Sequence, residues 1–319
     1  MCGLYLAHLH HGRRACFACR SIERPQPPCV LRVSGPPVES VSSDNFRGLP
    51  VTTIASVKRT ALITGASAGI GEAFADVFAT EGFDLVLVAR REDRLNAIAE
   101  RLSKAHGTRV HVLAADLSTP NACERICADL QSRGIQIDAL VNNAGYGVPG
   151  KYTASPWQRH QDFLQVLVVA VTEMTYRLLP GMIERGYGRI INVASLAGLV
   201  PAPAGHTLYG ASKAFLIKFS EALSNEVRSK NVHVTALCPG FTKSEFHDVT
   251  GTRGQMNLPE WMWMDAATVA RQGFDAVNAG DFIYVNGRVN RTIAALVRHL
   301  PQRLVYYVGR QSGRRYRKT

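Results

Sequence analysis

Residues 60–71 read Thr-Ala-Leu-Ile-Thr-Gly-Ala-Ser-Ala-Gly-Ile-Gly, and this stretch decides how the rest of the chain is interpreted. It opens with an apolar, β-branched run, which predicts a short strand. Three glycines follow, and apolar residues then recur at helical spacing as far as Phe78. We therefore expect a strand, a glycine-rich turn and a helix in direct succession, with Gly82 ending the helix.

The glycine-rich turn has the character of a binding site for a diphosphate group. Gly65 permits a sharp turn, Gly69 leaves room for a phosphate, and Gly71 lets the helix and the strand pack closely. Bare backbone N–H groups and the positive N-terminus of the helix meet here and attract an anion. An ordinary strand-to-helix turn is the alternative, but the strand and helix that a dinucleotide site requires are both expected.

Strand and helix patterns alternate along the body of the chain. Further strands are expected at 84–89, 109–115, 137–141, 189–194 and 232–238, and a seventh at 281–285; helices are expected at 92–106, from 120 onward, at 156–184 and at 209–230. The long helix is expected to be interrupted near Pro180. This alternation predicts right-handed crossovers and a single α/β domain with a doubly wound parallel sheet. Ligands of such sheets bind beyond the carboxyl ends of the strands, where the polar and glycine-rich clusters of this chain fall.

The positive charge of the chain lies at its two ends. The net charge is +12, of which +3 falls in residues 1–57 and +9 in residues 288–319, so the body between them is neutral overall. A neutral body argues against a broad nucleic-acid surface and fits an enzyme with a basic tail. We therefore divide the chain into an N-terminal extension (1–57), an α/β domain (58–287) and a basic tail (288–319).

Residues 1–57 are rich in Pro, Ser, Arg and Cys and lack a sustained apolar period, which favours disorder. Two alternatives are an organelle transit peptide, because Arg is frequent and acids are rare, and a natural start that lies further along the chain. Cys16 and Cys19, with His8 nearby, could form half of a zinc site. A second pair of ligands is missing, so no metal is expected.

The cysteines of the body, Cys123, Cys127 and Cys238, lie in apolar helix or strand patterns. They are typical of reduced core thiols, which predicts an intracellular protein located in the cytoplasm. No uninterrupted apolar run reaches the roughly 18 residues that a spanning helix needs.

Two arginines, Arg90 and Arg91, end the second expected strand, nineteen residues after Gly71. In dinucleotide-binding sheets an acid at this place holds a ribose hydroxyl, whereas an arginine suits a ribose phosphate. No acid appears until Glu92, and two guanidinium groups can grip a phosphate through forked hydrogen bonds. We therefore predict NADP(H) rather than NAD(H); the alternative is that one or both arginines are solvated surface charges.

Tyr209 and Lys213 share one face of an expected helix because they are four residues apart, and Ser195 follows the strand before that helix. A free phenol has a pKa of about 10, so a neighbouring cation is needed to lower that pKa toward neutrality. The Ser195 hydroxyl could hold a carbonyl oxygen to which Tyr209 gives its proton. These residues predict proton transfer to or from a substrate oxygen.

With these motifs in order, the chain resembles the short-chain dehydrogenase/reductases over residues 58–250. The matches are the turn 64–71, Asn142-Asn143-Ala144-Gly145, Ser195, Tyr209 with Lys213, and Pro239-Gly240. The resemblance implies a Rossmann fold in which Tyr209 is the catalytic acid/base, Lys213 binds the nicotinamide ribose and tunes Tyr209, and Ser195 orients the carbonyl. It also implies cofactor contacts from Gly65, Ser67, Gly69, Ile70, Gly71, Arg90, Arg91, Asp116, Leu117, Asn143, Ala144, Gly145, Tyr209, Lys213, Pro239, Gly240 and Thr242.

Within the family, the glycine-rich turn, the Arg-Arg strand end and the Leu-Pro-Gly-Met run 179–182 look most like reductases of ketones and 3-oxoacyl chains. The resemblance implies an apolar or acyl-type carbonyl or alcohol substrate and a homo-oligomer, commonly a dimer or tetramer. One departure is Leu167, because the family usually carries there an Asn whose water feeds protons to the lysine, and leucine cannot hydrogen-bond. Leu167 supports the alternative of a weak or inactive nucleotide-binding regulatory protein, whereas the intact Ser195, Tyr209 and Lys213 oppose it.

Residues 243–264 follow the sixth expected strand and are rich in Met, Trp and Phe. In this fold such a segment usually covers the substrate, so its apolar bulk predicts a greasy substrate. Tyr146, Leu196 and Val200 are expected to share the pocket. Ordinary core packing or a subunit contact is the alternative.

The tail has apolar residues at helical spacing from Ile293 to Leu304, set among arginines. A basic amphipathic helix can lie on an anionic membrane surface, which would make the protein peripheral to a membrane. The alternative is a helix packed on the body with a frayed basic end, and it is favoured because Pro301 interrupts the pattern.

Overall fold

The structure is a computed structural model, and we describe residues 58–245, 259–301 and 303–307. All of them belong to one compact unit that runs from Ser56 onward. The predictions for residues 1–57, namely disorder, a transit peptide and a partial zinc site, lie outside the described residues. So does most of the apolar segment 243–264.

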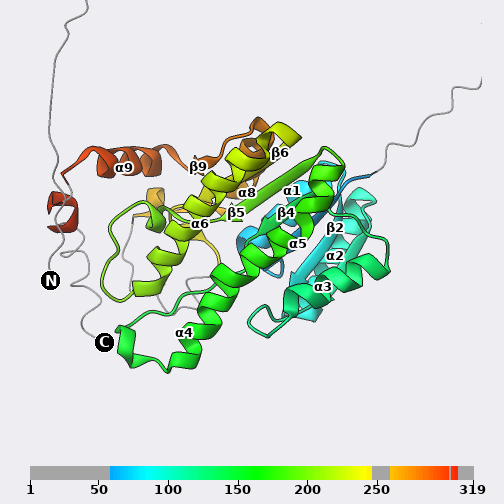
Figure 1. The fold of residues 1–319 in the computed structure, drawn as a ribbon, viewed down its shortest axis with the longest axis horizontal. Helices are drawn as coiled ribbons and strands as arrows, with labels where there is room; N and C mark the ends of the chain where they lie inside the picture. Colours follow the sequence, from blue (N-terminus) through cyan, green and yellow to red (C-terminus); the bar gives the residue numbers. More distant parts are fainter. Residues whose placement is uncertain (1–57, 246–258, 302, 308–319) are drawn as a thin grey trace, which may run out of the picture. The chain divides into compact units, whose positions relative to one another are not determined.

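A seven-stranded parallel sheet forms the centre of this unit, in the order β3-β2-β1-β4-β5-β6-β9 (Figure 1). The strands are β1 (Thr60–Thr64), β2 (Asp84–Ala89), β3 (Val110–Ala114), β4 (Ala139–Asn142), β5 (Gly188–Val193), β6 (Val232–Cys238) and β9 (Ile283–Val285). The predicted strands are therefore present, with bounds that differ from expectation by no more than two residues. The strand order reverses between β1 and β4, and a crevice opens beyond the carboxyl ends of strands at such a switch.

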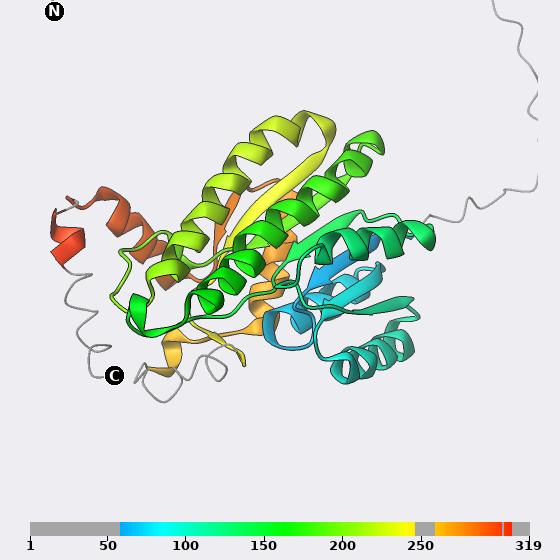
Figure 2. The same ribbon diagram turned by 60° about the horizontal axis from the view of Figure 1, so that its bottom comes forward.

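Helices cover both faces of the sheet, which confirms the doubly wound architecture. The helices are α1 (Gly69–Thr80), α2 (Glu92–His106) and α8 (Ala266–Ala279) on one face, and α3 (Ala122–Ser132), α4 (Trp157–Leu164), α5 (Ala170–Glu184) and α6 (Thr207–Val227) on the other. Figure 1 shows α5 and α6 in front of the sheet and α1 and α8 behind it, and Figure 2 shows the same layers after a rotation. Alternate strand residues feed the two cores: Ile63 packs in one and Leu62 in the other.

The long helical segment is interrupted earlier than predicted. α5 runs through Pro180 without a break, and the irregular turn is the π-helical η3 (Gln165–Val169) between α4 and α5. The expected interruption near Pro180 is therefore wrong. Pro180 cannot donate to the carbonyl of Tyr176, but Tyr176 is 78% exposed, so water can satisfy that carbonyl.

Two backbone carbonyl groups of the π-helical region η3 accept hydrogen bonds from a side chain close by in the chain. The Thr172 hydroxyl donates to the carbonyls of Val168 and Val169 at 3.0 and 2.9 Å. By length and composition the 28-residue run Trp157–Glu184, which contains an 18-residue window with a mean hydropathy of 1.4, is able to cross a membrane. Its inward side chains, such as Phe163, are nevertheless part of the domain core against the sheet. The run is therefore also what a core helix of an α/β domain looks like.

Short elements complete the connections between the helices and strands. They are the 3₁₀ turns η2 (Tyr152–Ala154), η4 (Leu196–Gly198), η5 (Arg228–Lys230) and η7 (Glu260–Met262), and the two-stranded pair β7 (Thr242–Lys243) and β8 (Met264–Asp265); α9 (Arg288–His299) follows β9. Cys123 and Cys238 are buried and Cys127 is half-buried, all as free thiols. The three cysteines of the body thus occupy the core positions predicted for them.

Candidate active site

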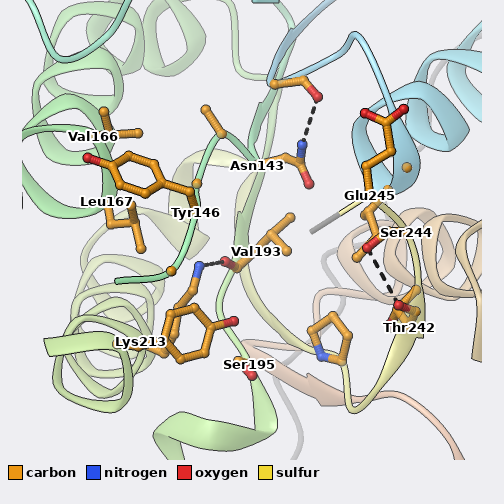
Figure 3. A pocket seen from close by; sticks show the side chains of 18 of the residues that line it. Asn143, Tyr146, Val166, Leu167, Val193, Ser195, Lys213, Thr242, Ser244 and Glu245 are labelled. Carbon is orange, nitrogen blue, oxygen red and sulfur yellow. Dashed lines mark hydrogen bonds between the residues drawn. The ribbon is translucent and has the colours of Figure 1, made fainter. Parts of the chain in front are cut away.

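The segments that follow the strands meet in one cavity of about 810 Å³ at the carboxyl edge of the sheet (Figure 3). Apart from Gly71, every residue given a catalytic or cofactor role by sequence lines this cavity. These residues are Gly65, Ser67, Gly69, Ile70, Arg90, Arg91, Asp116, Leu117, Asn143, Ala144, Gly145, Ser195, Tyr209, Lys213, Pro239, Gly240 and Thr242. Tyr146, Leu196 and Val200, expected on the substrate side, line it as well. The structure therefore brings the predicted site together at one place.

The glycine-rich turn is shaped by the absence of side chains. Gly65 and Gly69 have φ angles of 66° and 60°, in the left-handed region that favours glycine. A Cβ on Gly71 would lie 2.2 Å from the carbonyl oxygen of Gly65, so Gly71 allows close packing rather than lining the cavity. Among the described residues no side chain caps the N-terminus of α1, which leaves its first N–H groups for an anion. This cradle fits the diphosphate of a dinucleotide.

Asn143 ties the end of β4 to the glycine-rich turn. Its side-chain amide donates to the carbonyls of Thr64 and Gly65 at 3.0 and 3.2 Å. The Thr64 hydroxyl in turn accepts hydrogen bonds from the backbone N–H groups of Asn143 and Ala144 at 3.0 and 3.1 Å. These bonds join β1 and β4 at the point where the strand order reverses, so the crevice is built into the fold.

Ser195, Tyr209 and Lys213 reach the cavity from two elements. Ser195 immediately precedes η4, whereas Tyr209 and Lys213 lie near the start of α6. Lys213 Nζ lies 5.7 Å from the centre of the Tyr209 ring and donates to the carbonyl oxygen of Val193 at 2.7 Å (Figure 3). The Ser195 side chain hydrogen-bonds with Tyr209. An alcohol, a phenol and an amine thus share one wall of the cavity.

Burial controls the protonation of these groups. It raises the pKa of Tyr209 above its usual value, although the hydrogen bond with Ser195 acts in the opposite direction. Burial also lowers the pKa of Lys213 to about 8. The nearby Cys238 thiol stays neutral, because burial raises its pKa to about 12. Lys213 therefore does not lower the pKa of the phenol as expected; only the hydrogen bond with Ser195 acts in that direction, and burial outweighs it.

Arg91 makes the most extensive polar contacts at the other end of the cavity. Its Nε and Nη2 atoms donate to Ser67 Oγ at 3.2 and 3.0 Å, and its Nη1 atom donates to Glu245 Oε2 at 2.8 Å. Arg94 donates to the other Glu245 oxygen at 2.5 Å. Arg90, beside it in the chain, is exposed and lines the cavity. The guanidinium groups of Arg90 and Arg91 thus lie where a ribose phosphate is expected, and Arg94 is joined to Arg91 through Glu245.

Asp116 follows β3 and lines the same end of the cavity. Its Oδ1 atom accepts hydrogen bonds from the backbone N–H and the hydroxyl of Ser118 at 2.9 and 2.7 Å. Burial acts to raise the pKa of Asp116, but the bonds from Ser118 and the charge of Arg90 hold that pKa below its usual value. Asp116 is therefore a fixed anion at this end of the cavity, and its contact with an adenine stays a prediction.

Sequence reasoning missed ionisable residues of the cavity, among them Glu245 and His206. Burial lowers the pKa of His206, which keeps its imidazole neutral near pH 7. The place of His206 one helical turn before Tyr209 was a signal available in the sequence. No such signal pointed to Glu245, because its partner Arg91 is 154 positions away in the chain.

Leu167 lies in the π-helical turn and is 1% exposed. It lines the cavity, and its Cγ atom would lie 3.5 Å from a Cβ built on Gly145 (Figure 3). The place that the family usually gives to a hydrogen-bonding Asn is thus filled by packed hydrocarbon. Irregular π-helical turns often occur at functional sites, and this one contributes Val166 and Leu167 to the lining of the cavity.

The apolar segment expected to cover the substrate contributes less than predicted over its described part. Trp261 is 67% exposed, and neither it nor the rest of residues 259–264 lines the cavity. Met264 instead packs against the core cluster behind the sheet, and Trp263 lies 5.7 Å from the ring of Phe241, a residue that does line the cavity. Through Phe241, Trp263 thus contacts the cavity wall. The remaining part, 246–258, lies outside the described residues.

Comparison with known proteins agrees with this site. The family model described as short chain dehydrogenase matches residues 59–253. The very-long-chain 3-oxoacyl-CoA reductase of the duck Anas platyrhynchos is 33% identical over 205 residues, which is 63% of this chain and 65% of that protein. This chain therefore matches slightly less than two thirds of the length of that relative.

Solved structures show the same architecture. A short-chain dehydrogenase from Sphingobium yanoikuyae, in complex with NADPH, is 28% identical with a TM-score of 0.67, and the match covers 76% of this chain and 97% of that one. An alcohol dehydrogenase from Comamonas testosteroni, specific for bulky-bulky ketones, is 28% identical with a TM-score of 0.63, over 76% of this chain and 95% of that one.

Proposed function

Because the chain belongs to the short-chain dehydrogenase family, a family of oxidoreductases that act on carbonyl and hydroxyl groups, we propose that it is an NADPH-dependent reductase of apolar or acyl-type ketones. The observation that carries the proposal is the convergence of Ser195, Tyr209 and Lys213 on the cavity that also contains the glycine-rich cradle. The reverse reaction, oxidation of a secondary alcohol, uses the same groups.

The choice of NADPH rests on the arginines at the end of β2. The first acid after that strand is Glu92, and the cavity is lined there by Arg90 and Arg91. Arg91 already presents a fork of N–H groups to Ser67 and Glu245, which is the geometry that suits a phosphate. The relative from Sphingobium yanoikuyae was solved with NADPH, which agrees with this choice.

Bound NADPH supplies the hydride for the reduction. Ser195 and Tyr209 are placed to hydrogen-bond the carbonyl oxygen together, because their own hydroxyl groups are already in contact. The raised pKa of Tyr209 keeps its phenol protonated, so Tyr209 is ready to give its proton to the oxygen that becomes an alcohol. Lys213 is held by the Val193 carbonyl beside the Tyr209 ring, where its charge can stabilise the phenolate that remains.

The substrate class rests on the cavity wall and on the relatives. Tyr146, Val166, Leu167 and Val200 give the cavity an apolar side. The duck relative is named for 3-oxoacyl-CoA reduction and the Comamonas structure for bulky ketones, and both names describe a ketone flanked by large groups. We therefore place an extended or bulky apolar ketone here. Cytoplasmic location and a homo-oligomeric state stay predictions.

A nucleotide-binding regulatory protein with little turnover is the second candidate. The observation that favours it is the buried Leu167, since this residue offers no hydrogen bond to a proton-relaying water. An intact hydroxyl, phenol and amine around the same cavity favour the enzyme instead.

Turnover decides between the two candidates. We would screen a panel of ketones of increasing size with NADPH, using the full chain and its Tyr209→Phe variant. The enzyme hypothesis predicts oxidation of NADPH by the wild type and a loss of at least about a hundredfold in kcat for Tyr209→Phe, with NADPH binding retained. Tyr187→Phe is the matched control, because Tyr187 lies at the opposite edge of the sheet between the guanidinium groups of Arg59 and Arg189. Activity that survives Tyr209→Phe would remove Tyr209 as the proton donor.

A further inference from the structure

We propose that the exposed face of α9, continued by residues 303–307, is a docking surface for an anionic lipid bilayer. We call it the tail surface; it consists of Val289, Ile293, Leu296, Leu300 and Leu304 with the flanking Arg288, Arg291, Arg298 and Arg303. The inference goes beyond the proposed reductase activity and is argued from burial, charge and position.

α9 is attached to the domain mainly through its first turns. Asn290 is its one fully buried residue, and its side-chain amide donates to the carbonyl of Asn286 at 2.8 Å. The Arg291 guanidinium lies 5.9 Å from the centre of the Tyr284 ring on β9. After these contacts the side chains of α9 are half-buried or exposed as far as His299. The helix is therefore held at its beginning and presents most of its length to solvent.

Apolar side chains form one stripe, in which Ile293 is half-buried and the others are exposed. Val289, Ile293, Leu296 and Leu300 recur at intervals of four, three and four residues, which places them on one side of a helix. Val289, Leu296 and Leu300 are 43%, 56% and 41% exposed, and Leu304 beyond Pro301 is 47% exposed. α9 ends before Pro301, whose carbonyl accepts hydrogen bonds from the N–H groups of Leu304 and Val305, so that a new turn begins and carries the exposed Leu304. An exposed apolar stripe of this kind marks an interaction surface.

The charge around this stripe selects an anionic partner. Residues 282–319 contain nine Arg or Lys and no Asp or Glu. Arginines contribute to binding at a negatively charged lipid surface, and their long aliphatic stems can lie along apolar surface while the charge stays in water. A second copy of the chain is a poor occupant, since a two-fold contact would bring two acid-free basic segments together. An apolar stripe in a basic setting is what an interfacial helix presents to a bilayer.

The tail surface begins beside the predicted nicotinamide end of the cavity. The side chain of Asn290 occupies the space where a Cβ on Gly240 would lie, at 2.4 Å, and Gly240 lines the cavity. In both ribbon views α9 lies at the end of the domain where α6 begins, and α6 carries Tyr209 (Figures 1 and 2). If the substrate is an apolar ketone, which rests on the proposed function, a bilayer held there would be its reservoir.

Vesicle co-sedimentation of the full chain tests the tail surface. The probes are phosphatidylcholine vesicles with and without phosphatidylglycerol, each at low and high salt. The apolar test variant is Leu296→Asp with Leu300→Asp; its matched control is Tyr176→Asp, because Tyr176 is a 78% exposed aromatic on a different helix, α5. The charge test variant is Arg298→Ser with Arg303→Ser, matched by Lys104→Ser with Lys230→Ser at exposed positions of α2 and η5.

We expect binding to anionic vesicles that exceeds binding to neutral vesicles by at least about tenfold and weakens at high salt. Substitution of the two leucines should lower binding to anionic vesicles at least about tenfold, and substitution of the two arginines should lower it about tenfold. Neither control variant should change this binding more than about twofold. Equal binding to both vesicle types, or leucine variants that bind like wild type, would overturn the inference. A fall in the oligomer mass of the leucine variant with unchanged vesicle binding would reassign the stripe to a subunit contact. Because the readout is sedimentation, inactivity toward ketones would not affect it, and active enzyme without vesicle binding would reject this inference alone.

Discussion

The Arg91 guanidinium donates to the Glu245 carboxylate at 2.8 Å across the mouth of the cavity, joining the end of β2 to the segment after β7. Glu245 also accepts from Arg94, and hydrogen bonds from Arg94 and Arg91 hold the pKa of Glu245 below its usual value. Figure 3 shows Glu245 on the opposite side of the cavity from Lys213. A carboxylate therefore occupies Arg91, one of the two arginines on which the proposed NADPH selectivity depends.

Replacing that carboxylate should favour the phosphorylated cofactor. In Glu245→Gln the guanidinium groups lose a competing anion, so we expect the Kd for NADPH to fall about threefold to tenfold while the Kd for NADH changes little. Fluorescence titration of both cofactors measures this. Glu260→Gln is the control, because Glu260 pairs with Lys243 and not with these arginines. Equal changes for NADPH and NADH would mean that Glu245 acts on the shape of the cavity rather than on the phosphate.

Removing the Ser195 hydroxyl should shift the pH dependence of catalysis. The Ser195 hydrogen bond acts to lower the pKa of Tyr209, so its loss in Ser195→Ala raises that pKa further. Alcohol oxidation needs the deprotonated phenol, and its rate should therefore rise at a higher pH than in the wild type, with kcat reduced about a hundredfold. Ser195→Thr keeps a hydroxyl and should retain the wild-type profile. If the profiles of kcat against pH coincide for Ser195→Ala and the wild type, Ser195 does not influence the pKa of Tyr209.

Lys213 should make the stability of the free protein depend on pH. Burial lowers the pKa of Lys213 from 10.5 to about 8, so the folded state holds an unfavourably buried ammonium below pH 8. Between about pH 8 and 10.5 the unfolded chain binds the proton more tightly than the folded one, and stability therefore rises with pH through this window. In Lys213→Met this rise is absent, and the variant should be more stable than wild type at pH 7 by on the order of 3 kcal/mol. Urea unfolding of both proteins at pH 7 and pH 10 checks this, and a constant stability difference would contradict it.

Most of the fold could be predicted from the sequence because the local patterns and the family motifs agree. The strand Thr60–Thr64 and the helix Glu92–His106 have the predicted bounds, since each is closed by a glycine or a polar turn. The site residues also follow strand ends, and parallel topology brings strand ends together without further information. This is why Ser195 and Tyr209 could be placed in one cavity from the sequence alone.

The remaining features depend on contacts that no local pattern records. The partner of Arg91 is set by where the segment after β7 crosses the cavity, which only the folded chain determines. The interruption of the long helix was predicted at Pro180, but the helix accommodates this proline because Tyr176 is exposed and water can reach its carbonyl group. The irregular turn lies instead where the Thr172 hydroxyl can donate to two carbonyl groups. The raised pKa of Tyr209 likewise follows from burial, which spacing cannot reveal.

Leu167 offers a test of how protons reach Lys213. Its side chain lies in the π-helical turn beside Gly145, and leucine offers no hydrogen bond to the water that an Asn would hold. If the missing water slows proton resupply, Leu167→Asn should raise kcat where proton transfer limits turnover, while the buried amide lowers stability by about 1–3 kcal/mol. Leu167→Val is the control, because it alters packing without adding a hydrogen bond. The measurement is kcat across pH in ordinary and heavy water; a kcat that stays unchanged at every pH in Leu167→Asn would show that protons reach Lys213 by another route.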